Sequence, residues 1–164
     1  MNHEMPARIL ALSNLVMEID QLKTGGKMIG LCHGCFDIVH FGHLIHFNEA
    51  AKQVDVLVVS VTPDRYVNKG PTRPIFGEQH RVFFLSNLRS VDYVFLNDTP
   101  DAIHPLSTIG PDIYFKGADY KEHKSEGYVR EESFCSIKGI RLIHTAGDRF
   151  SSTETLRFLG ATYE

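Results

Sequence analysis

The run VDVLVVSV, Val54 to Val61, constrains the fold of this chain more than any other stretch. It is rich in β-branched residues and apolar almost throughout, whereas a strand with one face in water alternates apolar and polar residues. A continuous apolar run of this kind is typical of a strand that is covered on both faces. It therefore predicts a parallel sheet with helices on either side.

Short apolar runs of the same kind alternate with segments of helical spacing along the chain. We expect strands at residues 28–32, 54–61, 91–96, 112–117 and 140–144. We expect helices at residues 6–23, 44–52, 78–90, 101–109, 128–138 and 151–159. This alternation predicts an α/β fold: a Rossmann-like, doubly wound parallel sheet of about five strands in a single domain.

The first expected helix stands apart from the alternation. Its apolar residues recur at spacings of three and four: Ile9, Leu12, Val16, Ile19 and Leu22. Such a stripe must be buried, either on its own domain or against a second subunit, and the sequence leaves both possibilities open. We treat residues 1–26 as an N-terminal helical extension and residues 27–164 as the main domain.

Composition narrows the class of partner and the compartment. The formal net charge of -3 argues against a partner held through nucleic-acid phosphates. No stretch approaches the roughly 18 unbroken apolar residues of a membrane span. Cys32, Cys35 and Cys135 cannot all pair with one another, and the amino terminus carries no apolar signal segment. We therefore expect a reduced, cytoplasmic protein that binds neither nucleic acid nor membrane.

In a doubly wound sheet, ligands bind outside the carboxyl ends of the strands, near the point where the strand order reverses. The loops at this edge are expected at residues 32–43, 62–77, 116–126 and 145–153. The first of them contains GCFDIVHFGH, Gly34 to His43, which has two histidines around a glycine. Three interpretations of this segment are open: a metal site, a redox pair and a cradle for phosphate.

A metal site would draw on the soft ligands gathered here, which are Cys32, Cys35, His40, His43 and His46. A structural zinc site normally needs a second ligand pair a dozen or more residues away, and this spacing lacks one. A redox pair would use Cys32 and Cys35, which have the thioredoxin spacing. Cys32, however, falls within an apolar run and fits better as a buried small residue, and His46 fits better as a hydrogen-bonded core residue.

A phosphate cradle uses the backbone as well as the side chains. The N-terminus of a helix presents free N–H groups and the positive end of its dipole, so a glycine turn that runs into a helix forms an anion site. Gly34 and Gly42 would let the chain approach a phosphate closely. His40 and His43, three residues apart, would lie on one face and donate hydrogen bonds to phosphate oxygens. Asp37 either caps this helix or orients a histidine.

The segment resembles the signature of the nucleotidyltransferase superfamily, Gly-x-Phe-Asp followed by His-x-Gly-His, found in cytidylyltransferases and related adenylyltransferases. The resemblance extends from about Lys27 to Leu159. It implies that residues 27–164 form a nucleotidyltransferase domain. In such enzymes a phosphate of the substrate attacks the α-phosphorus of a nucleoside triphosphate in line, and pyrophosphate leaves. The protein places the reactants and stabilises negative charge.

Two further stretches are similar to bacterial heptose-1-phosphate adenylyltransferases: NKGPTRPIFGEQHR, residues 68–81, and GPDIYFKGADY, residues 110–120. Glycerol-3-phosphate cytidylyltransferases share the first motif and VDYV, but Ala146 stands where their late signature has an arginine. The resemblance thus favours a sugar-phosphate branch in envelope polysaccharide synthesis. ATP and CTP remain alternatives, because base recognition by backbone groups leaves no residue signature. A non-catalytic nucleotide-binding module is an alternative of another class.

The resemblance also implies roles for individual residues. His40, His43 and Lys69 would be catalytic, although a solvated loop lysine is the alternative for Lys69. The implied nucleotide-binding residues are Gly34, Cys35, Phe36, Asp37, Gly42, Lys116, Gly117, Ser151, Ser152 and Thr153. Arg81 and Arg89, eight apart on one expected helix, would reach the acceptor phosphate, with a surface ion pair as the alternative for Arg81.

Cofactor and assembly follow from the same resemblance. Mg²⁺ is expected because a triphosphate is presented to a chain without enough positive charge to neutralise it. The triphosphate itself would hold most of the Mg²⁺ coordination, and Asp37 is the nearest candidate ligand in the protein. The partners implied are a nucleoside triphosphate and a phosphorylated sugar or polyol. The habit of the family favours a homodimer.

Overall fold

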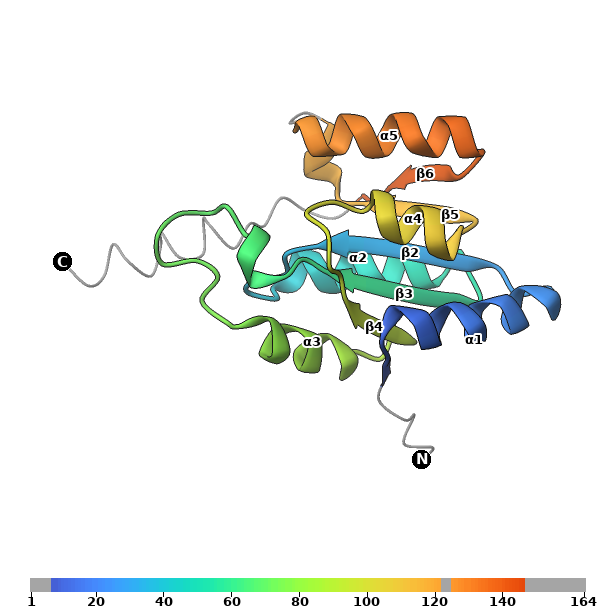
Figure 1. The fold of residues 1–164 in the computed structure, drawn as a ribbon, viewed down its shortest axis with the longest axis horizontal. Helices are drawn as coiled ribbons and strands as arrows, with labels where there is room; N and C mark the ends of the chain where they lie inside the picture. The colour runs from blue at the N-terminus through green and yellow to red at the C-terminus, as the bar shows by residue number, and fades with distance from the viewer. Residues whose placement is uncertain (1–6, 122–124, 147–164) are drawn as a thin grey trace.

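The computed structural model of the chain describes residues 7–121 and 125–146. Its strands form one parallel sheet with the order β1-β4-β3-β2-β5-β6 (Figure 1). The strands are β1 (Arg8–Ile9), β2 (Ile29–Gly34), β3 (Val56–Val61), β4 (Tyr93–Leu96), β5 (Ile113–Lys116) and β6 (Arg141–His144). Every residue of β3 is buried, as its continuous apolar run predicts.

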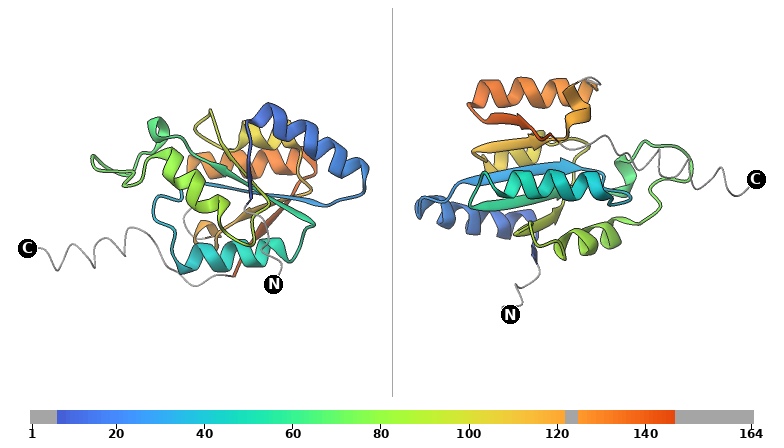
Figure 2. Two further views of the ribbon diagram at one scale, coloured as in Figure 1. Left: turned by 90° about the horizontal axis from the view of Figure 1, so that it is seen from below. Right: turned by 180° about the vertical axis from the view of Figure 1, so that it is seen from behind.

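Helices cover both faces of the sheet, which confirms the doubly wound α/β fold. One face carries α1 (Leu12–Thr24), α4 (Ile103–Ile109) and α5 (Glu126–Lys138), and the other carries α2 (Phe41–Ala51) and α3 (Glu78–Ser86) (Figure 2). Each layer of helices encloses its own hydrophobic cluster against the strands. Within the described residues, none of these helices has the length and apolar character needed to cross a membrane.

The chain before α1 differs from the expected helix, because residues 8–9 form a sixth strand. The amide of Arg8 donates to the carbonyl of Asp92, and the amide of Leu10 donates to that of Val94. These bonds place β1 on the outer edge of β4, so α1 begins only at Leu12. The apolar spacing that includes Ile9 is compatible with a helix, but the partner strand decides the conformation.

Helix α1 shares a core with the sheet, so its apolar face packs on its own domain. Leu15 and Ile19 are almost fully buried, in the cluster that includes Ile29 of β2. At its end, the Lys23 ammonium donates to two carbonyls at the end of α4, those of Ile109 and Gly110, at 2.5 and 2.6 Å. A lysine in this position also complements the negative end of the α4 dipole.

Three aspartates, each one residue before a strand, fasten the amino edge of the sheet. Their Oδ2 atoms accept main-chain N–H groups of neighbouring strands: Asp55 from Met28 at 2.9 Å, Asp92 from Leu57 at 2.8 Å and Asp112 from Ile29 at 2.7 Å. The carboxyl edge has no such fastening row among the described residues, and it is where the predicted ligand loops meet.

Candidate active site

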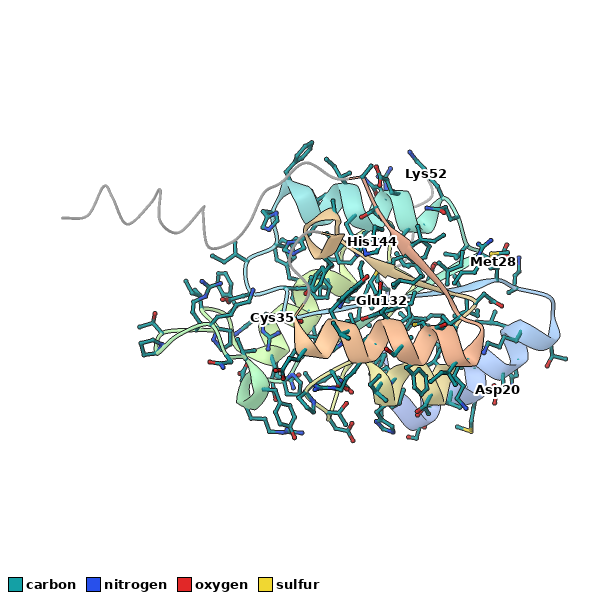
Figure 3. All side chains as sticks on the ribbon, turned by 90° about the horizontal axis from the view of Figure 1, so that it is seen from above. Asp20, Met28, Cys35, Lys52, Glu132 and His144 are labelled. Carbon is teal, nitrogen blue, oxygen red and sulfur yellow. The ribbon has the colours of Figure 1, made fainter. Side chains whose placement is uncertain are left out.

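The predicted phosphate segment lies at the carboxyl end of β2, the strand at which the sheet order reverses. From β2 the sheet continues through β3 to one side and through β5 to the other, which is the usual position for a ligand in a doubly wound sheet. His40 is the residue directly before α2, so the segment joins the end of β2 to the N-terminus of that helix. Figure 3 shows Cys35 at the opposite end of the sheet from Met28, which lies at the amino edge.

His40 and His43 lie together, as their spacing predicts. Their ring centroids are 3.9 Å apart, with 32° between the ring planes. The backbone amide of His40 donates to Nδ1 of His43 at 3.4 Å. Because an amide can only donate, this Nδ1 carries no proton, and the neutral ring of His43 holds its proton on Nε2. His43 is therefore arranged as an Nε2–H donor at the start of α2.

His43 is a neutral group at physiological pH. Burial lowers its pKa to about 3, and the charges of His40, His46 and Lys69 act in the same direction. A neutral imidazole that donates through Nε2 can stabilise an oxyanion without first gaining a proton. Lys69 is exposed on the loop that follows Asp64–Tyr66.

Gly34 and Phe36 form the support beneath the histidines. Phe36 adopts a left-handed backbone with φ +50°, which is uncommon for a bulky side chain. Its ring lies so close to Gly34 that a Cβ there would come within 3.0 Å of Cζ of Phe36. The same ring meets His43 edge-on, with 5.3 Å between the centroids. Gly34 is thus required for packing under the site, since it makes room for the ring that supports His43.

Asp37 is buried and organises the neighbouring loop, contrary to the interpretation as a helix cap or a magnesium ligand. Its carboxylate pairs with Nε of Arg73 and accepts from the amides of Ile75 at 2.7 Å and Phe76 at 3.3 Å. Burial raises the pKa of this carboxyl, but these hydrogen bonds outweigh burial and hold the pKa below its usual value. Both oxygens are committed to the protein, so Asp37 does not fit Mg²⁺.

The metal and redox interpretations receive no support from this geometry. In the described part of the chain, no group of three or more His, Cys, Asp or Glu side chains is arranged to hold a metal ion. Cys32 is wholly buried in β2, and burial raises the pKa of its thiol well above the usual range. A thiol in that state is a poor nucleophile, because the thiolate is the reactive form.

Arg81 is a structural residue, which corrects the prediction that it reaches the acceptor phosphate. It is 1% exposed. Its guanidinium donates to the carbonyls of Phe76 at 2.9 Å, of Thr62 at 2.8 Å and of Cys35, and to the carboxylate of Asp64 at 2.7 Å. Arg81 therefore ties the loops after β2 and β3 to the start of α3, and its planar set of donors suits this task better than a lysine would.

Lys116 ends β5 at the same edge, but its ammonium faces the interior. It is 4% exposed and pairs with Glu131 of α5 at 2.8 Å. Its carbonyl accepts from the amide of Thr145 at 3.0 Å, and the Thr145 hydroxyl lies 2.8 Å from Nδ1 of His46. This chain of contacts joins β5 to α2, the helix that carries His43. It also confirms His46 as a hydrogen-bonded core residue.

Comparison with known proteins identifies the family of this domain. Residues 31–157 match the cytidylyltransferase-like family. The chain belongs to this family. "Bifunctional protein HldE" of Granulibacter bethesdensis is 45% identical over 113 residues, which are 66% of this chain and 23% of that protein. "Bifunctional protein HldE" of Campylobacter fetus is 38% identical over 128 residues, 76% of this chain and 27% of that protein.

A solved structure shows the same architecture. The lipopolysaccharide core biosynthesis protein from Thermoplasma volcanium superposes with a TM-score of 0.63 at 27% identity, covering 76% of this chain and 100% of that one. The cytidylyltransferase-like chain spans about a quarter of the length of the HldE proteins that it matches. Family membership confirms both the resemblance drawn from Gly34 to His43 and the Rossmann-like fold.

Arg89 lies beyond the end of α3, which corrects its predicted place on one helix with Arg81. Helix α3 runs back from the carboxyl edge and ends at Ser86, so Arg89 falls in an exposed turn just before β4. That turn is at the amino edge of the sheet. The expected pairing of Arg81 with Arg89 on one helix face assumed four more helical residues than this cytidylyltransferase-like domain has.

The remaining predicted residues divide into two groups. Gly42 lies in the first turn of α2, and Gly117 directly follows β5, so both are at the carboxyl edge. Ser151, Ser152 and Thr153 lie outside the described residues. Their predicted contacts to phosphate stay predictions.

Two residues of this cytidylyltransferase-like site had no role assigned from the sequence. Arg73 pairs with Asp37 across 36 positions, and only the concentration of basic residues in its loop drew attention to it. His33 is buried between the hydroxyls of Ser60 at 3.0 Å and Thr62 at 3.4 Å. No sequence signal marks it, because its partners come from the neighbouring strand.

Proposed function

We propose that this chain transfers a nucleoside monophosphate from ATP or CTP to a sugar- or polyol-phosphate and releases pyrophosphate. Within this class we propose a reaction like that of the heptose-1-phosphate adenylyltransferases of envelope polysaccharide synthesis. The sequence stretches at residues 68–81 and 110–120, the HldE relatives and the lipopolysaccharide core biosynthesis protein support this choice. The alternative is a glycerol-3-phosphate cytidylyltransferase-like activity, with CTP as the nucleotide and glycerol 3-phosphate as the acceptor.

The observation that carries the proposal is the pairing of two histidines at the N-terminus of a helix. His40 and His43 stand where α2 presents its free N–H groups and the positive end of its dipole. The Nε2–H of His43 is free of the helix-capping contact, which uses Nδ1. Such donors suit the negative charge that develops when pyrophosphate leaves, and Lys69 adds a cation on the exposed side.

We propose that Mg²⁺ enters bound to the triphosphate and not as an ion held by protein carboxylates. The occupied oxygens of Asp37 support this assignment. When bound, Mg²⁺ would neutralise charge on the phosphates, while the chain supplies placement and hydrogen-bond donors.

A pyrophosphate-release assay tests the reaction. ATP and CTP are each combined with heptose 1-phosphate and with glycerol 3-phosphate in the presence of Mg²⁺. We expect release only when triphosphate and acceptor are both present, and fastest release with ATP and heptose 1-phosphate. Preference for CTP and glycerol 3-phosphate would favour the cytidylyltransferase alternative.

The same assay separates an enzyme from a nucleotide-binding module. A triphosphate that raises the melting temperature of the protein, without pyrophosphate release on any acceptor, would overturn the proposed reaction. His43→Asn serves as the inactive control. His80→Asn, on the exposed surface of α3, is its matched control and is expected to behave as wild type.

We further propose that the protein is a cytoplasmic homodimer. The free thiols Cys32, Cys35 and Cys135 support a reducing compartment. Support for a dimer comes from Phe83 and Phe84 of α3, which are 66% and 53% exposed side by side in the sequence. Sedimentation over a range of concentrations tests the dimer, and Phe83→Lys with Phe84→Lys is expected to give a monomer.

A further inference from the structure

Lys116 occupies a closed, aromatic environment beneath the carboxyl edge of the sheet. Its ammonium lies 2.8 Å from a carboxylate oxygen of Glu131 and 3.0 Å from the hydroxyl of Tyr114. The ring of Tyr120 lies over the ammonium at 4.2 Å from the centroid, and the ring of Tyr128 lies at 5.9 Å. A lysine that binds phosphate must expose its ammonium, whereas this one is enclosed by protein on all of these sides.

Glu131 is the fixed counterpart of this ammonium. Its Oε1 accepts from the amide of Ala102 at 3.0 Å, and its Oε2 accepts from the hydroxyl of Tyr114 at 2.8 Å. Burial raises the pKa of Glu131, but the charge of Lys116 and the hydrogen bonds from Lys116 and the amide of Ala102 outweigh burial, so the pKa lies below its usual value. Glu131 and Lys116 thus form a buried ion pair, and removing either one leaves an uncompensated buried charge.

The ammonium of Lys116 also contacts a turn at the surface. Tyr120 belongs to the turn Ala118–Lys121, which follows Gly117 at the edge where the site lies. Its ring packs on the ammonium and on the ring of Tyr128, 5.4 Å away between centroids. The backbone of Lys116 is in turn linked to α2 through Thr145. Lys116 thus stands between the turn and the helix that carries His43.

We propose that Lys116 is a positioning residue, whose ammonium, held by Glu131 and covered by Tyr120, keeps the turn Ala118–Lys121 in place at the nucleotide side of the site without touching the substrate. This assignment rests on the proposed nucleotidyl transfer for its kinetic consequence. It replaces the expectation that Lys116 contacts the nucleotide. It also assigns a role to Glu131, which holds the ammonium, and to Tyr120, which links the ammonium to the turn.

Glu131→Gln separates positioning from direct binding by the sign of its effect. If Lys116 positions the turn, losing the carboxylate loosens the ammonium and the turn, and KM for the triphosphate rises, by about fivefold or more, while kcat changes less. If Lys116 binds phosphate, losing its internal partner frees the ammonium, and KM for the triphosphate falls or stays unchanged. A fall, no change, or a loss confined to kcat would each overturn the proposal.

A second pair of variants distinguishes positioning from packing alone. Lys116→Met with Glu131→Leu removes both buried charges, and we expect this double variant to recover most of the melting temperature lost in Glu131→Gln. The raised KM should persist, because the cation under Tyr120 is gone. If KM recovers together with stability in the double variant, Lys116 and Glu131 contribute packing only. Lys27→Met, in an exposed ion pair with Asp55, is the matched control and should change neither quantity.

Tyr114→Phe is the milder variant if Glu131→Gln does not fold. It removes only the hydroxyl that bridges Lys116 and Glu131, and we expect a smaller rise in KM in the same direction.

Hydrogen exchange of the ligand-free protein keeps this test independent of the proposed reaction. In Glu131→Gln, or in Tyr114→Phe if that variant must stand in, we expect faster amide exchange over residues 117–121. Exchange in α2 should remain close to that of wild type. Unchanged exchange in the turn would overturn the positioning role. If wild type releases no pyrophosphate but exchange in the turn rises as expected, the proposed function fails and the positioning role of Lys116 stands.

Discussion

The amide of His40 donates to Nδ1 of His43 across 3.4 Å, so one histidine of the pair sets the tautomer of the other. The contact lies within the first turn of α2, where it also satisfies an N–H group that the helix itself leaves without an acceptor. The capping contact therefore uses Nδ1 of His43 and leaves Nε2 for the contact with phosphate that we propose.

Substitutions of His43 that mimic one nitrogen at a time are expected to differ in activity. His43→Gln places an amide near the position of Nε2, whereas His43→Asn places one near Nδ1. Because the donor at Nε2 faces the phosphates in the proposed reaction, His43→Asn should lose about a hundredfold or more in kcat, and His43→Gln should lose less. Steady-state pyrophosphate release measures both. Equal or greater activity of His43→Asn would contradict the assignment of Nε2.

Replacement of Arg81 by lysine is expected to destabilise the protein although the charge is kept. A lysine cannot satisfy the carbonyls of Cys35, Thr62 and Phe76 at once. Buried acceptors that lose their donors cost about 1–3 kcal/mol each, so the free energy of unfolding should fall by about 2 kcal/mol or more. Urea denaturation measures the change.

Arg89→Lys is the matched exposed control for this substitution, with an expected change within about 0.5 kcal/mol. A role of Arg81 at the acceptor phosphate makes a different prediction: KM for the acceptor would rise while the stability of Arg81→Lys stayed at the wild-type value. That result would restore the role expected from the sequence.

Asp37→Asn is expected to weaken the fold without changing the dependence of activity on Mg²⁺. The substitution breaks the buried ion pair with Arg73 and leaves that guanidinium without its carboxylate, which should cost about 3 kcal/mol. Thermal and urea unfolding report the loss, and Asp20→Asn on the exposed side of α1 is the control. A large increase in the Mg²⁺ concentration needed for half-maximal activity would indicate instead that Asp37 is a ligand.

Stability is expected to fall as the pH drops from about 6.5 toward 4. Burial, with the charge of Lys116 acting in the same direction, lowers the pKa of both His33 and His46 to about 4. Both histidines titrate near 6.5 in the unfolded chain, so between these values the unfolded state binds more protons and protonation favours unfolding. Above pH 6.5 neither state is protonated and the contribution vanishes.

The magnitude of this effect is about 1.4 kcal/mol for each proton and pH unit, and urea denaturation between pH 7 and 5 measures it. His46→Asn should flatten the dependence, because it removes one titrating group while keeping a polar atom near Thr145. His80→Asn, the same replacement at an exposed position, is the control variant. An unchanged slope in His46→Asn would show that His46 is protonated normally in the folded protein.

Local sequence patterns were sufficient to predict the elements whose surroundings impose residue types on neighbouring positions. The apolar run of β3 and the alternation of strands with helices predicted the doubly wound sheet, and the segment Gly34–His43 predicted a turn that runs into the start of α2 with its two histidines together. These predictions succeed because burial on two faces and the free amides of a helix N-terminus impose residue types at short range.

The short strand β1 and the end of α3 were decided at longer range. Arg8 and Ile9 have no strand pattern of their own, and their conformation depends on hydrogen bonds to β4, more than 80 residues away. Helix α3 ends four residues before the predicted boundary because the chain must turn to enter β4. Helical periodicity continues past such a turn, so it cannot mark the boundary.

By itself the sequence determined the class of fold, the place of the candidate site at the end of β2 and the pairing of His40 with His43, since these follow from patterns at short range. Only the tertiary structure decided which charged side chains face the site and which hold it together. Asp37, Arg81 and Lys116 each meet partners distant in sequence, and burial with those partners commits their charges to the protein. These charges are paired because an unpaired buried charge is costly, and their partners come together only when the chain folds.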